Sequence, residues 1–206
     1  MTIVIVDYGM GNLGSIANML RKIGAHSEVS GDPDRIATAE SLVLPGVGAF
    51  DVAMDTLRAS GLIEPLERQV RDRGVPLLGI CLGMQLLATS SEEGTSAGLD
   101  WIPGRVARLP TEGPDGPVRI PHMGWSTVAA AKPASRLPAL GTGEARYYFV
   151  HSYAFGCDDP NDVLGESSYG CPFTSAVERD NVVGVQFHPE KSHRHGLALL
   201  ADFAGL

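Results

Sequence analysis

The sequence has few cysteines and no long apolar run, and each absence excludes a class of protein. Three cysteines, Cys81, Cys157 and Cys171, are an odd and low number, so they cannot form a complete disulfide framework. We therefore expect a reducing compartment, the cytoplasm, and at least one free thiol. No apolar run approaches the roughly 20 residues that a membrane-spanning helix requires, so we expect no membrane span.

A basic patch is also missing. The chain has 16 basic and 24 acidic side chains, giving a net charge of −8, and its lysines and arginines are scattered. This excludes the positive surface that typically binds nucleic acid or an anionic membrane. The N-terminal segment reaches Asp7 without a basic leader, which favours a first strand over a signal peptide.

Apolar runs alternate with helical patterns in the first half of the chain. Continuous apolar runs predict buried strands at residues 2–6, 41–44 and 77–80. Apolar residues at helical spacing predict helices at residues 12–23, 51–59 and 62–73. Apolar strands separated by helices are typical of a parallel sheet that is covered on both faces.

The second half contains more proline and glycine. It predicts loops at residues 110–117 and 132–143, strands at 105–109, 146–150, 174–178 and 182–187, and a last helix at 196–203. We found no internal repeat and no long linker. The sequence thus predicts an α/β fold, a single domain over residues 1–206, with a mostly parallel twisted sheet, flanking helices and an antiparallel extension.

The most informative motif surrounds Cys81. An apolar strand runs into Gly79-Ile-Cys81-Leu-Gly83, and a helical pattern follows at once. Glycines two residues before and after a nucleophile permit a tight strand-to-helix turn that lifts its side chain out of the sheet. A helix N-terminus favours the reactive thiolate. The alternative is an unreactive core cysteine, because free cysteine is often buried.

A candidate base for this thiol follows the last predicted strand, in Phe187-His188-Pro189-Glu190. The residue before a proline is held extended, so side chains two residues apart point the same way. Glu190 is then within reach of the His188 ring and can orient it while the other ring nitrogen takes a proton. The alternative is a surface His-Pro turn.

A third motif, Pro45-Gly46-Val47-Gly48, also follows a predicted strand. Its glycines allow backbone N–H groups to turn toward a ligand. Together with the Leu82 N–H, they are candidates for an oxyanion site. By itself this motif is weak, since glycine loops follow many strands.

Together the three motifs resemble the class I (triad) glutamine amidotransferase family. Within it, the sequence is most similar to the glutaminase subunits of imidazole glycerol phosphate synthases. The similarity follows the chain in order, at residues 7–13, 44–50, 79–87, 91–94, 121–125, 148–153 and 185–192. The motif at 121–125 and the start at 7–13 are the more specific pieces.

This resemblance implies a cysteine glutaminase. Cys81 would attack the side-chain amide of glutamine, with His188 as base and Glu190 orienting it. The oxyanion would meet main-chain groups of Val47, Gly48 and Leu82. The family binds the amino and carboxylate groups of glutamine at the positions of Gln85, Glu93, Ser152 and Tyr153.

The resemblance also implies a partner. Ammonia would pass to a (β/α)8 cyclase (synthase) subunit of a heterodimer in histidine biosynthesis. The positions facing that subunit are Asn12, Trp125, Tyr148 and Lys191. No cofactor and no metal are implied.

Two departures and one different function remain open. Ser126 stands where the family has asparagine, and His193-Arg-His195 is outside the pattern; with His188 these histidines are weak candidates for a metal site.

The turn Gly9-x-Gly11-x-x-Gly14, with Glu28 beyond it, matches a nicotinamide-dinucleotide fingerprint. That alternative leaves the motifs around Cys81 and His188 without a role. Nearer alternatives are other amidotransferase glutaminases and an inactive interaction subunit.

Overall fold

The computed structural model describes residues 2–114, 116–132, 136–143 and 145–205. Five strands form the parallel half of the main sheet. In spatial order they are β2 (His26–Ser30), β1 (Thr2–Val6), β3 (Ser41–Gly46), β4 (Leu77–Cys81) and β15 (Val182–Val185). The sheet is therefore parallel where the sequence predicted continuous apolar strands.

The sheet continues as a mainly antiparallel extension. Its strands are β14 (Cys171–Arg179), β12 (Tyr153–Cys157), β6 (Gly104–Arg108) and β5 (Ser90–Ser91), with β13 (Val163–Tyr169) and β10 (Ala129–Ala130) pairing beside β14. Two further antiparallel pairs are β9 (His122–Thr127) with β11 (Arg146–His151), and β7 (Glu112–Gly113) with β8 (Gly116–Pro117).

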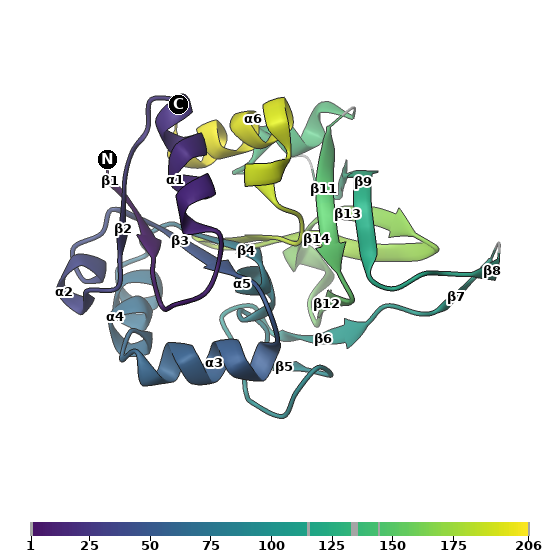
Figure 1. The fold of residues 1–206 in the computed structure, drawn as a ribbon, viewed down its shortest axis with the longest axis horizontal. Coiled ribbons are helices and arrows are strands. Elements are labelled where there is room, and N and C mark those ends of the chain that lie inside the picture. The colour runs from purple at the N-terminus through teal and green to yellow at the C-terminus, as the bar shows by residue number, and fades with distance from the viewer. Residues whose placement is uncertain (1, 115, 133–135, 144, 206) are drawn as a thin grey trace.

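Helices cover both faces of the sheet (Figure 1). On one face lie α1 (Leu13–Lys22) and α6 (His193–Ala204), and on the other lie α2 (Pro33–Ile36), α3 (Phe50–Ala59) and α4 (Ile63–Glu67). The short elements are α5 (Leu82–Gln85), the π turn η1 (Arg68–Asp72), and the 3₁₀ turns η2 (Pro138–Thr142), η3 (Pro160–Asp162) and η4 (Pro189–Lys191).

The core is divided by the sheet because strand side chains alternate between its faces. On β1, Ile3 and Ile5 pack in the cluster that includes Leu20 of α1 and Leu199 of α6. Val4 and Val6 point into the opposite cluster, with Phe50 of α3. Burial on both faces explains why this strand is apolar at every position from Ile3 to Val6 and not only at alternate ones.

The predicted fold class is confirmed, with corrections to individual elements. The predicted helix at 62–73 is α4 followed by a π turn, the last helix begins at His193, and the predicted loop at 110–117 carries the hairpin β7–β8. Residue 115 of the first predicted loop and residues 133–135 of the second lie outside the described residues. The extent of the domain, residues 1–206, stays a prediction. Within the described part of the chain, no helix is long and apolar enough to cross a membrane.

Candidate active site

Cys81 occupies a strained turn between β4 and α5. Its φ is +55° and its ψ is −111°, a conformation that L-residues rarely adopt and that costs about 1–3 kcal/mol. A Cβ on Gly83 would overlap the carbonyl oxygen of Leu44, and one on Gly79 would lie 2.9 Å from the carbonyl oxygen of Gly83. Both flanking glycines are therefore required by close backbone packing. The helix that follows Cys81 is only one turn long.

His188 and Glu190 lie beside this turn because β15 is the parallel neighbour of β4. The carboxyl ends of both strands reach the same edge of the sheet, with Val185 opposite Ile80. Nδ1 of His188 and Oε1 of Glu190 are 2.8 Å apart, and these side chains are only 3% and 1% exposed. The ring also interacts with the Cys81 side chain, and both line the same cavity. The three predicted triad residues thus lie next to one another.

The protonated form of His188 is favoured in this environment. Burial by itself lowers its pKa, but hydrogen bonds to Cys81 and Glu190, with the charges of both, outweigh burial and raise the pKa to about 9. A proton taken from the Cys81 thiol is therefore stabilised on the ring. This arrangement suits a base that takes the proton of a nucleophile during attack.

A cavity of about 300 Å³ opens in front of Cys81 and His188. It brings together ten predicted site residues, namely Val47, Gly48, Cys81, Leu82, Gln85, Glu93, Ser152, Tyr153, His188 and Lys191. Three lining residues were not predicted as site residues: Pro121, Val150 and His151. All three lie within or next to the motifs at 121–125 and 148–153, so proximity to those motifs was the available signal.

The polar groups of the cavity are held by hydrogen bonds. Oε2 of Glu93 accepts a hydrogen bond of 2.9 Å from the Phe50 N–H. Nε2 of Gln85 donates to the Tyr153 carbonyl at 3.1 Å and to Oε1 of Gln186 at 3.0 Å. Gln186 was also missed by the sequence analysis, although it stands two residues before His188 and so on the same side of an extended segment.

His151 belongs to a buried pair of histidines with fixed tautomers. Its Nδ1 lies 2.8 Å from the Tyr153 carbonyl, so this nitrogen carries the proton and Nε2 accepts. His122 therefore donates from Nδ1, at 3.0 Å, and accepts from the Ser126 hydroxyl at Nε2. Burial lowers the pKa of both rings to about 4, and both are neutral at pH 7. Serine at position 126 thus has a hydrogen-bond role.

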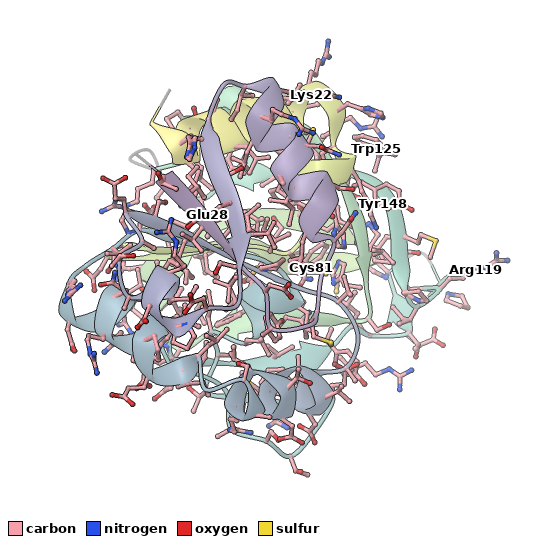
Figure 2. The ribbon with its side chains drawn as sticks, turned by 60° about the vertical axis from the view of Figure 1, so that its left-hand side comes forward. Lys22, Glu28, Cys81, Arg119, Trp125 and Tyr148 are labelled. Carbon is pink, nitrogen blue, oxygen red and sulfur yellow. The ribbon has the colours of Figure 1, made fainter. Side chains whose placement is uncertain are left out.

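The residues predicted to face a partner lie at the rim of the cavity and beyond it. Trp125 is 38% exposed, stacks on His193 at 5.5 Å and meets Tyr148 edge-on at 6.0 Å. The ammonium of Lys191 lies 5.9 Å from the centre of the Tyr148 ring. Figure 2 shows Trp125 and Tyr148 next to each other at the side of the molecule, with Cys81 farther inside.

Asn12, the fourth predicted partner residue, is exposed at the start of α1. Its side chain makes no capping hydrogen bond.

The glycine turn at residues 9–14 packs against the loop at residues 45–48, which reaches the active-site cavity. A Cβ on Gly11 would lie 2.8 Å from Cβ of Pro45, and the acidic Glu28 is paired with Arg35. The absence of a side chain at Gly11 is therefore explained by packing, without a nucleotide.

Known proteins resemble this chain over nearly its whole length. The family described as Glutamine amidotransferase class-I matches residues 4–205. This chain belongs to that family. Two amidotransferase relatives are both described as subunits of imidazole glycerol phosphate synthase. Subunit HisH from Syntrophotalea carbinolica is 49% identical, covering 99% of this chain and 100% of the relative. Subunit HisH 2 from Pseudomonas aeruginosa is 46% identical, covering 99% of each.

Solved amidotransferase structures share the fold at lower identity. A structure described as a glutamine amidotransferase superimposes with a TM-score of 0.74 at 17% identity, covering 99% of both chains. The structure of PurLQS from Thermotoga maritima gives a TM-score of 0.72 at 18% identity, covering 99% of this chain and 97% of that one.

Proposed function

We propose that this protein is the glutaminase subunit of an imidazole glycerol phosphate synthase and hydrolyses glutamine to glutamate and ammonia. The observation that carries the proposal is that Cys81 and His188 line the same cavity and interact, while the ring of His188 hydrogen-bonds Glu190 behind it. Identity of 46–49% to subunits of that synthase supports the assignment to this synthase.

The proposed reaction has two halves. The Cys81 sulfur attacks the amide carbon of glutamine, and the thiol proton passes to His188 and then to the departing nitrogen, which leaves as ammonia. A water molecule then gives a proton to His188 and attacks the thioester carbon, releasing glutamate and the Cys81 sulfur. Glu190 holds the ring in position through both halves, and backbone groups of Val47, Gly48 and Leu82 stabilise the oxyanion.

Gln85 and Glu93 are suited to bind the ammonium group of glutamine. Both N–H groups of Gln85 are already used, by Tyr153 and Gln186, so its oxygen is the atom left to face a ligand. Glu93 adds a carboxylate that is oriented by the Phe50 N–H. Ser152 and Tyr153, which line the same cavity, are proposed to bind the carboxylate end of the substrate.

The partner proposed for the rim is the cyclase subunit, in a heterodimer located in the cytoplasm. Trp125 and the partly exposed Tyr148 offer the aromatic groups that interfaces favour, and Lys191 and Asn12 are exposed polar groups beside them or nearby. The rim is also connected to the base, His188, by hydrogen bonds. The His188 N–H donates to the Tyr148 carbonyl at 2.9 Å, and Ser192 bonds the Tyr148 N–H and the His188 carbonyl. A partner that moves Tyr148 would therefore move His188.

The test is glutamate release from glutamine by the purified chain, alone and with a cyclase subunit carrying its nucleotide ligand. Strong activation by partner and ligand supports the full proposal. High activity of the chain alone would support a glutaminase of a different amidotransferase. No release in either case, together with NAD binding by the same preparation, would contradict the proposal and favour the nucleotide-binding alternative.

A further inference from the structure

Gln186 is completely buried directly behind the nucleophile. Its exposed fraction is 0%, and its Nε2 lies 3.8 Å from the sulfur of Cys81, a hydrogen-bond distance at the long end for sulfur. It stands in the segment between β15 and His188. The sulfur is therefore contacted by two side chains of this segment, the imidazole of His188 and the amide of Gln186.

The orientation of the Gln186 amide is fixed by its neighbours. The Tyr153 carbonyl can only accept, so the Gln85 atom that faces it must be its nitrogen. That same nitrogen contacts Gln186, so the Gln186 atom that receives it must be an oxygen. The remaining end of the Gln186 amide, which faces Cys81, is then the NH2 group. Since an amide NH2 only donates, it favours a sulfur that carries negative charge.

We propose that Gln186 is a further catalytic residue, which donates a hydrogen bond to the Cys81 sulfur and stabilises its thiolate, and that Gln85 positions Gln186 for this role. The proposal rests on the function proposed above for Cys81. It adds a hydrogen-bonded chain in which Gln85 donates to the Tyr153 carbonyl, in the wall of the substrate cavity, and to Gln186, and Gln186 donates to the nucleophile. Substrate contacts at Gln85 and thiolate stability are thereby linked.

The test is the pH dependence of Cys81 alkylation by iodoacetamide, followed by mass spectrometry of the Cys81 peptide in the full-length protein. Gln186→Met keeps the length of the side chain and removes the donor. We expect its alkylation midpoint to rise by about 0.5–1 pH unit, and the rate below the midpoint to fall about three- to tenfold. Gln85→Leu, which leaves Gln186 in place without its orienting partner, should give a smaller shift in the same direction.

Gln69→Met is the matched control, because Gln69 is equally buried but donates to the Ala39 carbonyl, away from Cys81. It should keep the wild-type midpoint. Thermal unfolding of each variant checks the fold, and Gln85→Leu decides the test if Gln186→Met does not fold. A midpoint within about 0.2 pH unit of wild type in folded Gln186→Met, or in Gln85→Leu if that variant decides, overturns the proposal. Alkylation needs no glutamine turnover, so this result is separate from failure of the glutaminase assay.

Discussion

Two regions meet at Lys191 and differ in burial. They are the catalytic core around Cys81 and His188 and the rim of the cavity around Trp125. In the core, the side chains of His188 and Glu190 are almost inaccessible and bonded to each other, and Cys81 is only 8% exposed. At the rim, Trp125 is 38% exposed, and Lys191 and His193 are exposed. Burial and hydrogen bonds pre-organise the reacting groups within one chain, whereas the rim keeps the exposed aromatic surface that a second protein can cover.

The sharpest test of the core is Cys81→Ala. We expect glutamate release to fall by at least about 10⁴-fold, because the reaction loses its nucleophile. Thermal unfolding should show that the fold is kept, since alanine retains the Cβ and the backbone of the turn and only the sulfur is removed. A variant that retains normal hydrolysis would contradict the assignment of the nucleophile.

Glu190→Gln tests the orientation of the base. The charge that stabilises protonated His188 is lost while the shape is kept, so we expect kcat to fall about 10²-fold with KM little changed. The measurement is steady-state glutamate release with the cyclase partner. If KM rises and kcat does not change, Glu190 acts in substrate binding and not on His188.

Trp125→Ala tests the rim separately from the core. Exposed aromatic residues are frequent hot spots, so we expect partner affinity to fall about 30-fold, or about 2 kcal/mol, by calorimetric titration with the cyclase subunit. The stability of the chain alone should fall by only about 1 kcal/mol, since Trp125 is partly exposed and loses its ring contacts with His193 and Tyr148. Val52→Ala, a change at an exposed apolar residue of α3, is the control and should not alter affinity. If Trp125→Ala changes the affinity for the cyclase subunit no more than Val52→Ala does, the interface lies elsewhere.

The smallest expected effect is on the pH dependence of stability, where core groups act in opposite directions. His122 and His151 have pKa values lowered to about 4 from about 6.5, so the unfolded state binds their protons first as the pH falls. Their contribution to stability is present above pH 6.5 and is lost toward pH 4. His188, with a pKa raised to about 9, contributes stability below pH 6.5 that is lost as the pH rises through 9.

Urea unfolding from pH 5 to pH 9 should therefore show maximal stability near pH 6.5–7, with a loss of about 2 kcal/mol at pH 5. His122→Phe keeps the stacking on Phe149 and Tyr169 and removes one titrating ring, so its acid slope should be smaller. His188→Gln should flatten only the alkaline side. If His122→Phe leaves the acid slope unchanged, other groups cause it.

Strands with strong local patterns could be predicted from the sequence in both halves, including β6, β11 and β14, whereas β2, β9, β12 and β13 could not. β1, β3 and β4 are apolar at successive positions, a strong local signal. The strand β2 at the sheet edge is mostly polar and only partly buried, and in β9 only His122 is fully buried while partly buried and exposed residues alternate after it. Their stability comes from pairing with β1 and β11, which no local pattern specifies.

The sequence by itself determined the chemistry of the site: a cysteine between two glycines, a His-Pro-Glu segment and a glycine loop, each directly after an apolar strand. Only the tertiary structure decided which other side chains join them. Gln85 meets Gln186 across 101 residues, and His122 meets His151 across 29. Short motifs can be recognised in a sequence because the local geometry of each requires particular residue types at fixed positions. A hydrogen bond between distant residues depends on how strands are ordered in the sheet, and that order is set by packing of the whole chain.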